Sequence, residues 1–97
     1  MNDKEMLELA AKAAGVEKVS GGYINEEWMP INWKPLDDCS DALRLIVRLK
    51  LNVEFSDGYV IVETNGGSVS FELGNNPFAA TRRAIVRAAA EIGREMK

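Results

Sequence analysis

The stretch LNVEFSDGYVIVETNGGSVSFEL, residues 51–73, contains three short strand patterns separated by the turn sequences SDG and NGG. Residues 51–55 and 69–73 alternate apolar and polar side chains, whereas residues 59–64 are apolar on both faces. The middle strand of a meander is the one expected to be buried on both faces. The order of these patterns therefore predicts an antiparallel β-meander of three or four strands.

Helical patterns lie on both sides of these strands. Residues 3–14 read as a helix that Asp3 caps and a glycine ends, and residues 40–50 read as a second helix. A third helix follows Asn76, which is a suitable N-cap. The chain between the first two helices, residues 16–38, reads as irregular except for a short strand near Tyr23 and Ile24. We expect one domain over residues 1–97, an α+β fold arranged as a three-layer α/β/α sandwich with about three helices.

The spacing of apolar residues predicts which faces point to the core. On the first strand these are Leu51, Val53 and Phe55. On the second helix they are Cys39, Ala42, Leu43, Ile46 and Leu49, so Cys39 is expected to be a buried, inert thiol. On the third helix they are Phe78, Thr81, Ile85, Ala88, Ala89, Ile92 and Met96. We expect the first helix to cover the second face of the sheet, with a partner or a second copy as the alternative cover.

The charge of the chain is unevenly distributed. Residues 1–41 contain nine acids and four lysines, a net charge of −5, whereas residues 42–97 contain eight bases and six acids, a net charge of +2. The whole chain carries −3, and proteins that bind polyanions are usually basic. The chain has one cysteine, no signal-peptide pattern and no apolar run of the roughly 18–20 residues that a membrane span requires. A cytosolic protein is therefore expected.

Two stretches, WKPLDDCSDALRL (residues 33–45) and NPFAATRRAIVRAAAEIG (residues 76–93), resemble the phage alpha-beta-alpha sandwich domain family, whose members are small proteins of tailed phages and bacterial prophages. The second stretch is the more specific of the two. The family usually shows a glycine after the paired aspartates, where this chain has Cys39 and Ser40. The resemblance implies a three-layer sandwich and a phage or prophage origin, and it carries over no catalytic or binding residues.

No catalytic pattern is present. The absence of histidine removes the most common general base and the most common metal ligand. Asp37, Asp38 and Asp41 surround the start of the second helix, where we interpret them as capping residues, with a site for a hard cation as the alternative. Neither phosphate-loop pattern, GxxxxGK[ST] nor GxGxxG, occurs. We expect no catalytic residues, no metal and no cofactor, and a protein that is not an enzyme.

Two groups of residues are candidates for an interaction surface. In residues 23–36, Tyr23 and Trp28 are candidate contact residues, because tyrosine and tryptophan anchor interfaces at low entropic cost, whereas Trp33 is expected to be structural. The second group consists of five arginines that would share one outer surface if the second and third helices lie side by side: Arg44, Arg48, Arg83, Arg87 and Arg94.

The arginines are interpreted first as the solvated side of their helices. Glu91 lies within pairing distance of Arg87 and Arg94, no aromatic residue is interleaved for base stacking, and no lysine adds to the stripe. An acidic protein surface is the second interpretation of what they face, and nucleic acid is the third.

These observations predict a small phage- or prophage-encoded accessory protein that acts by binding a host or phage macromolecule in the cytoplasm of the bacterial host. One alternative is a nucleic-acid-associated protein that uses the arginine-lined helical face. Another is a counter-defence protein that sequesters a small molecule such as a nucleotide, with Trp28 and Tyr23 lining its pocket.

Overall fold

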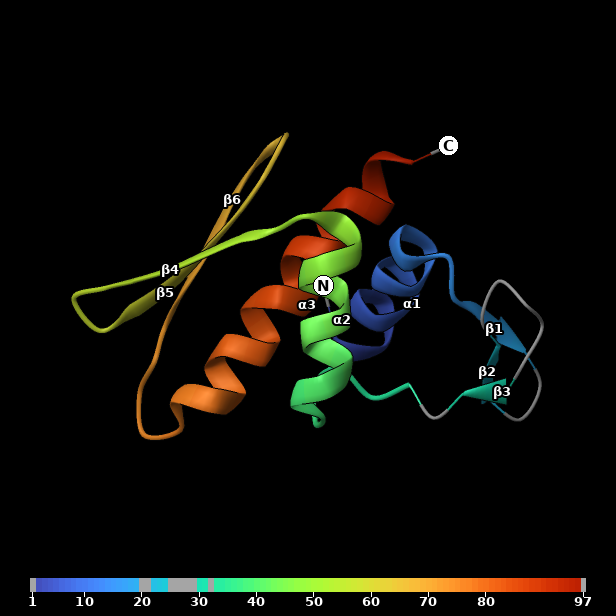
Figure 1. The fold of residues 1–97 in the computed structure, drawn as a ribbon, viewed down its shortest axis with the longest axis horizontal. Helices are drawn as coiled ribbons and strands as arrows, with labels where there is room; N and C mark the ends of the chain where they lie inside the picture. Colours follow the sequence, from blue (N-terminus) through green and yellow to red (C-terminus); the bar gives the residue numbers. More distant parts are fainter. Residues whose placement is uncertain (1, 20–21, 25–29, 32, 97) are drawn as a thin grey trace.

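The computed structural model describes residues 2–19, 22–24, 30–31 and 33–96. Three helices, α1 (Asp3–Ala14), α2 (Cys39–Leu49) and α3 (Pro77–Glu95), combine with antiparallel strands (Figure 1). The α+β class, the three helices and the antiparallel meander are therefore confirmed.

The meander consists of β4 (Asn52–Ser56), β5 (Tyr59–Thr64) and β6 (Gly67–Glu72), with β5 in the centre. Asp57 and Gly58 both have positive φ, 47° and 82°, as a two-residue hairpin turn of the primed type requires. The register pairs Val53 with Val62, so one face is apolar, and the other face is polar apart from Tyr59 and Ile61. Tyr59 is exposed and Ile61 is half-buried, so the burial of β5 on both faces that the sequence predicts is only partly observed.

A second, smaller sheet lies in the region predicted to be mostly irregular. Its strands are β1 (Glu17–Val19), β2 (Gly22–Ile24) and β3 (Pro30–Ile31), in that order and antiparallel. The predicted short strand near Tyr23 and Ile24 corresponds to β2. The neighbouring strands of two or three residues are too short to show an alternating pattern, which explains why the sequence did not reveal them.

Helix α3 occupies the centre of the molecule, and its two sides contact different layers. It packs on β5 and β6 of the sheet, and it packs on α1 and α2 on its other sides. In Figure 1 the meander and α1 accordingly lie on opposite sides of α3. The expectation that the first helix covers the second face of the sheet is wrong, because α1 packs on α3 instead.

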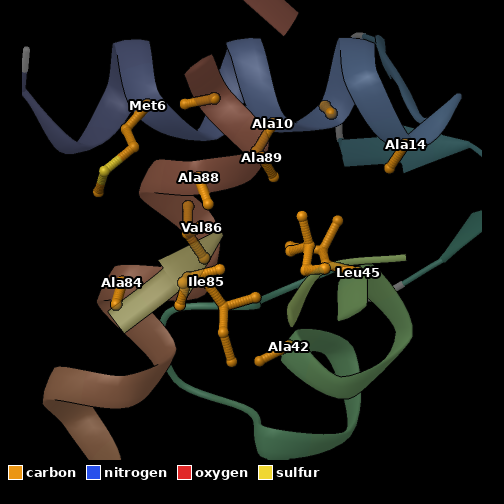
Figure 2. Close-up of a cluster of buried hydrophobic side chains, with 14 of the residues drawn as sticks. Met6, Ala10, Ala14, Ala42, Leu45, Ala84, Ile85, Val86, Ala88 and Ala89 are labelled. Atoms are coloured by element: carbon orange, nitrogen blue, oxygen red, sulfur yellow. The ribbon is translucent and has the colours of Figure 1, made fainter. Parts of the chain in front are cut away.

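Small residues explain the position of α1. A Cβ atom built on Gly93 of α3 would lie 1.9 Å from the backbone oxygen of Leu9, so the two helices approach each other backbone to backbone. Alanines of both helices belong to the same buried core, and Figure 2 shows Ala10 of α1 beside Ala89 of α3. The small side chains of α1 bury their apolar area only against a surface that can come this close. Helix α3 offers such a surface at Gly93 and its alanines, which favours α3 over the sheet as the partner of α1.

The α1–α3 contact is closed by polar groups at its ends. The Lys12 ammonium donates a hydrogen bond to the backbone oxygen of Met96, 2.9 Å away, at the C-terminus of α3. Asn2 rather than Asp3 caps α1, accepting from the backbone N–H of Glu5. Asp3 pairs instead with Arg83 of α3. Gly15 ends α1 in the left-handed conformation that had been predicted for it.

Helix α2 is rotated relative to its predicted orientation. Its buried residues are Asp41, Ala42 and Leu45, whereas Leu43 is 57% exposed. Cys39 is exposed as well, so the expectation of a buried thiol is wrong. The hydrophobic side of the helix therefore only partly faces the core, because Asp41 is drawn inward by the hydrogen bonds described below.

Predicted core residues at the ends of the other elements are also exposed. Phe55 on β4 and Phe78 on α3 are 61% and 72% exposed, and Met96 lies at the exposed end of α3. Val60 and Val62 on β5 are fully buried. The periodicity identified the correct faces of these strands, but α3 covers only β5 and β6, and Phe55 on β4 lies beyond its cover.

Candidate functional site

An open hollow of about 1280 Å³ lies beside the C-terminal half of α3. Its walls are the end of α2, the β5–β6 turn with most of β6, and α3 from Arg87 onward. Three of the five candidate arginines line it: Arg48, Arg87 and Arg94. We call this region the arginine hollow.

The β6 wall of the arginine hollow is rich in small polar residues. Thr64, Asn65, the two turn glycines and the serines at 68 and 70 face it, while Phe71 and Ile92 supply apolar surface. Such a wall combines hydrogen-bonding groups with apolar contact area. The volume exceeds the roughly 300–1,000 Å³ of pockets that enclose small ligands, and the open shape suits a segment of a larger molecule.

The charges in the hollow are partly neutralised from within. Glu91 accepts a hydrogen bond from Nε of Arg87 at 2.9 Å and lies 3.9 Å from the Arg94 guanidinium. Three arginines and two acids, Glu91 and Glu95, line the hollow. One carboxylate therefore serves two guanidinium groups, which leaves their remaining N–H donors available to an acidic ligand.

The other two candidate arginines lie apart from the hollow. Arg83 donates to Asp3 of α1 at 2.6 Å and so joins α3 to α1. Arg44 pairs with Asp41 of its own helix at 3.0 Å. The five candidate arginines are therefore divided: three line one hollow, and two hold ion pairs outside it.

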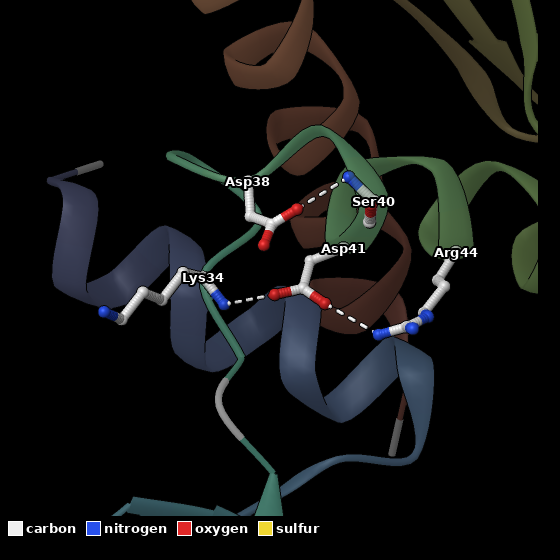
Figure 3. A network of polar contacts seen from close by, with 5 residues as sticks. All are labelled: Lys34, Asp38, Ser40, Asp41 and Arg44. Atoms are coloured by element: carbon white, nitrogen blue, oxygen red, sulfur yellow. Dashed lines mark hydrogen bonds and ion pairs between the residues drawn. The ribbon is translucent and has the colours of Figure 1, made fainter.

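Asp41 is the centre of a polar network before and within α2 (Figure 3). One carboxylate oxygen accepts from the backbone N–H of Lys34 at 2.8 Å, and the other accepts from Arg44. Asp38 caps the helix by accepting from the backbone N–H of Ser40. The capping role predicted for Asp38 is confirmed, whereas Asp41 reaches back across the N-cap and fixes the preceding loop.

The same loop is held from the other side by Arg82 of α3. Its Nε donates to the backbone oxygen of Leu36 at 2.8 Å, and its guanidinium donates to Sγ of Cys39 at 3.2 Å. Together Arg82 and Asp41 determine how α2 enters the core. The arginine is half-buried and structural, so it lies outside the candidate site.

The aromatic candidates are separated by the structure. The Tyr23 and Trp33 rings pack with centroids 5.1 Å apart and an interplanar angle of 57°, a tilted aromatic pair. Trp33 is buried, as predicted, and Tyr23 packs against the core, so Tyr23 has a structural contact. Trp28 lies outside the described residues, and its proposed contact role stays a prediction.

Within the residues that the structure describes, no three His, Cys, Asp or Glu side chains gather as metal ligands. No helix among these residues is long and apolar enough to cross a membrane.

Apart from the arginines, the residues that line the hollow were not identified as site residues from the sequence. Phe71 and Ile92 had been placed in the core stripes, yet both are half-buried and line the hollow. The polar residues of the NGG turn had been read only as a turn. No local signal distinguishes a turn that walls a hollow from one that faces solvent.

Comparison of the chain with family models, with curated proteins and with solved structures gives no match. The assignment to the family that the chain resembles stays a prediction.

Proposed function

We propose that this chain is a small accessory protein of phage or prophage origin that acts by binding, in the cytoplasm of its bacterial host, and that the arginine hollow receives an acidic segment of a host or phage protein. The observation that carries this proposal is the convergence of Arg48, Arg87 and Arg94 from two helices on one open hollow. Arginine guanidinium groups bind carboxylates in a bidentate manner, which gives both affinity and orientation.

Three features favour a protein segment over the two alternatives. The three outward-facing glutamates on the sheet, Glu54, Glu63 and Glu72, together with the net charge of −3, would repel a long nucleic acid that runs on past the hollow more than a short acidic segment that ends near it. Phe71, which is half-buried, is the one aromatic side chain among the described residues that line the hollow, and a single ring disfavours base stacking. The hollow is open and not enclosed, whereas small ligands such as nucleotides are usually bound in pockets that bury most of their surface.

The test is fluorescence anisotropy with a labelled peptide of ten glutamates, compared with a single-stranded DNA of similar charge. We expect binding of the peptide by the native chain and loss of at least about tenfold in affinity for the double variant Arg87→Gln and Arg94→Gln, because two charge-assisted contacts each contribute ~1–2 kcal/mol. The matched control is the double variant Arg44→Gln and Arg83→Gln, which removes the same charge outside the hollow.

The outcomes separate the hypotheses. Equal losses in the two double variants would mean that only net charge matters and would contradict the site. Preferential binding of the DNA, with steep weakening at higher salt, would favour the nucleic-acid alternative. A pull-down from host lysate with nuclease treatment, using the same variants, then identifies the natural partner.

A further inference from the structure

The meander is covered unevenly on the face that points to the helices. Helix α3 packs on β5 and β6, and no described helix makes comparable contact with β4. Val53 is half-buried and Phe55 is 61% exposed, although both point to the same side as the fully buried Val60 and Val62. The β4 part of the apolar sheet face is therefore only partly covered within the described chain.

The same strand is also an unpaired edge. In the described part of the chain, β4 pairs only with β5. Leu73 donates its backbone N–H to the oxygen of Gly58, so the backbone groups of Gly58 point toward β6. The backbone groups of the next residue, Tyr59, therefore point the other way, toward its partner Ser56 on β4. Because bonded and non-bonded pairs alternate along an antiparallel ladder, the N–H and C=O groups of Val53 and Phe55 point away from β5 to the free edge.

This edge has few of the features that usually prevent pairing with another chain, and Glu54 is the one charged side chain on it. Residues 52–56, NVEFS, contain no lysine and no proline, and the pairing with β5 runs without a bulge. The opposite edge, β6, differs because α3 covers its apolar side and the arginine hollow lies beside it. The two edges of the sheet are therefore not equivalent.

Apolar side chains continue from β4 onto the helix that precedes it. Leu43 and Val47, one turn apart on α2, are 57% and 71% exposed. Only Lys50 and the buried Leu51 separate α2 from β4. Figure 1 shows β4 leaving the end of α2 directly. The open strand edge and the exposed helix residues thus belong to consecutive elements.

We propose that two copies of this chain pair antiparallel through β4, about a two-fold axis, to form a continuous six-stranded sheet. A second copy supplies what the surface lacks: a free strand edge with the same groups and apolar side chains at the same height above the sheet. Phe55 of each copy becomes covered by the apolar face of the other. The dimer interface is separate from the arginine hollow, whose lining includes no residue of β4.

Charge complementarity argues for a second copy rather than a different protein. The basic Lys50 precedes β4, and the acidic Asp57 follows it, so antiparallel pairing brings Lys50 of each copy toward Asp57 of the other. The register with Val53 opposite Val53 places Asn52 opposite Glu54 of the second copy, so the two Glu54 carboxylates are diagonal neighbours and not directly opposed. A strand with opposite charges at its two ends is complementary to itself in this orientation.

The first test is the mass of the full chain by size-exclusion chromatography with light scattering, over roughly three decades of concentration. We expect about twice the 10.7 kDa of the chain at high concentration. Phe55→Lys, at an exposed position, should give a monomer. Tyr59→Lys is the matched control, because Tyr59 flanks the same turn, is 44% exposed and points to the other face of the sheet.

A monomer at all concentrations would overturn the proposal. A dimer that survives Phe55→Lys, or that is lost only in Tyr59→Lys, would overturn it too, because the interface would then lie elsewhere. Circular dichroism shows whether each variant is folded.

Hydrogen exchange of the unaltered chain tests the strand pairing without any substitution. The amides of Val53 and Phe55 should gain protection of about tenfold or more as the concentration rises, while the outward amides of β6 should not. Equal rates for Val53 and Phe55 in dilute and concentrated samples would contradict pairing through β4, even if the chain were a dimer.

The charge pairs provide a rescue experiment. Lys50→Asp should weaken dimerisation about threefold to tenfold, and the double variant Lys50→Asp with Asp57→Lys should restore it, because the exchanged charges again face each other. Lys50 itself has a φ of 54°, which shows that lysine is accepted in the left-handed conformation that Asp57 adopts. Failure of the double variant to recover would contradict the antiparallel placement.

Discussion

The two sides of α3 bury their residues in different ways. Toward α1, the contact consists of alanines and Gly93, and the two backbones nearly touch. Toward the sheet, branched side chains such as Val60 and Val62 fill the space, and the cover ends before β4. The contact between α1 and α3 therefore requires a residue without a side chain at position 93. The contact between α3 and the sheet instead requires large side chains to fill the space, and it leaves apolar side chains of β4 partly exposed. The surfaces proposed for binding both lie on the sheet side.

The most destructive change is expected at the closest point of the helix pair. Gly93→Ala places a Cβ where the Leu9 oxygen lies, so α1 and α3 must separate along their contact. We expect a loss of about 3 kcal/mol or more in the free energy of unfolding, as for severe overpacking. Urea denaturation measures it.

Gly66→Ala is the matched control for this change, because a Cβ at Gly66 meets no atom within 4 Å. A loss of stability at Gly66 equal to that at Gly93 would contradict the close helix contact.

A second comparison uses two leucines of one helix. Leu45 is 1% exposed and Leu43 is 57% exposed. Leu45→Ala should lower the unfolding free energy by ~3 kcal/mol, whereas Leu43→Ala should change it by less than ~0.5 kcal/mol. The same denaturation experiment measures both variants, and reversed effects would restore the orientation of α2 that the periodicity predicts.

The buried carboxylate tests why α2 is rotated. Asp41→Ala removes the acceptor of the Lys34 N–H and the partner of Arg44, so we expect a loss of ~2 kcal/mol. Asp37→Ala, at an exposed neighbouring position, should be close to neutral. Thermal unfolding followed by circular dichroism distinguishes them, and equal effects would mean that Asp41 contributes only general helix-end charge.

The smallest effect is expected at the ion pair that joins the outer ends of α1 and α3. Both partners, Arg83 and Asp3, are about half exposed, and exposed pairs contribute little. Arg83→Ala should lower the unfolding free energy by less than ~1 kcal/mol, and the loss should shrink in 1 M salt. A larger, salt-independent loss would show that Arg83 packs as well as pairs.

Local patterns identified the elements because the signals that specify them are short-range. The two hairpin turns, the Asn76 and Asp38 caps and the alternation along β4 and β6 each depend on residues within a few positions of one another. The arginines were found for the same reason, since the helix period places them away from the apolar stripe.

Pairing between distant elements was not predictable in the same way. The position of α1 depends on Leu9 meeting Gly93, and the orientation of α2 depends on Asp41 meeting the N–H of Lys34. The division of the arginines depends on Asp3 reaching Arg83. None of these contacts produces a repeating pattern in the sequence, because each joins one residue to one distant partner.

The sequence by itself determined the α+β class, the three helices, the meander with β5 at its centre, and the absence of histidine chemistry. These properties follow from hydrophobic period, turn residues and composition, which act locally or globally without reference to particular contacts. Only the tertiary structure decided which layer α1 covers, which side of α2 is buried, and which three arginines share a hollow. Each of these depends on volume and hydrogen bonding at one place where distant segments meet.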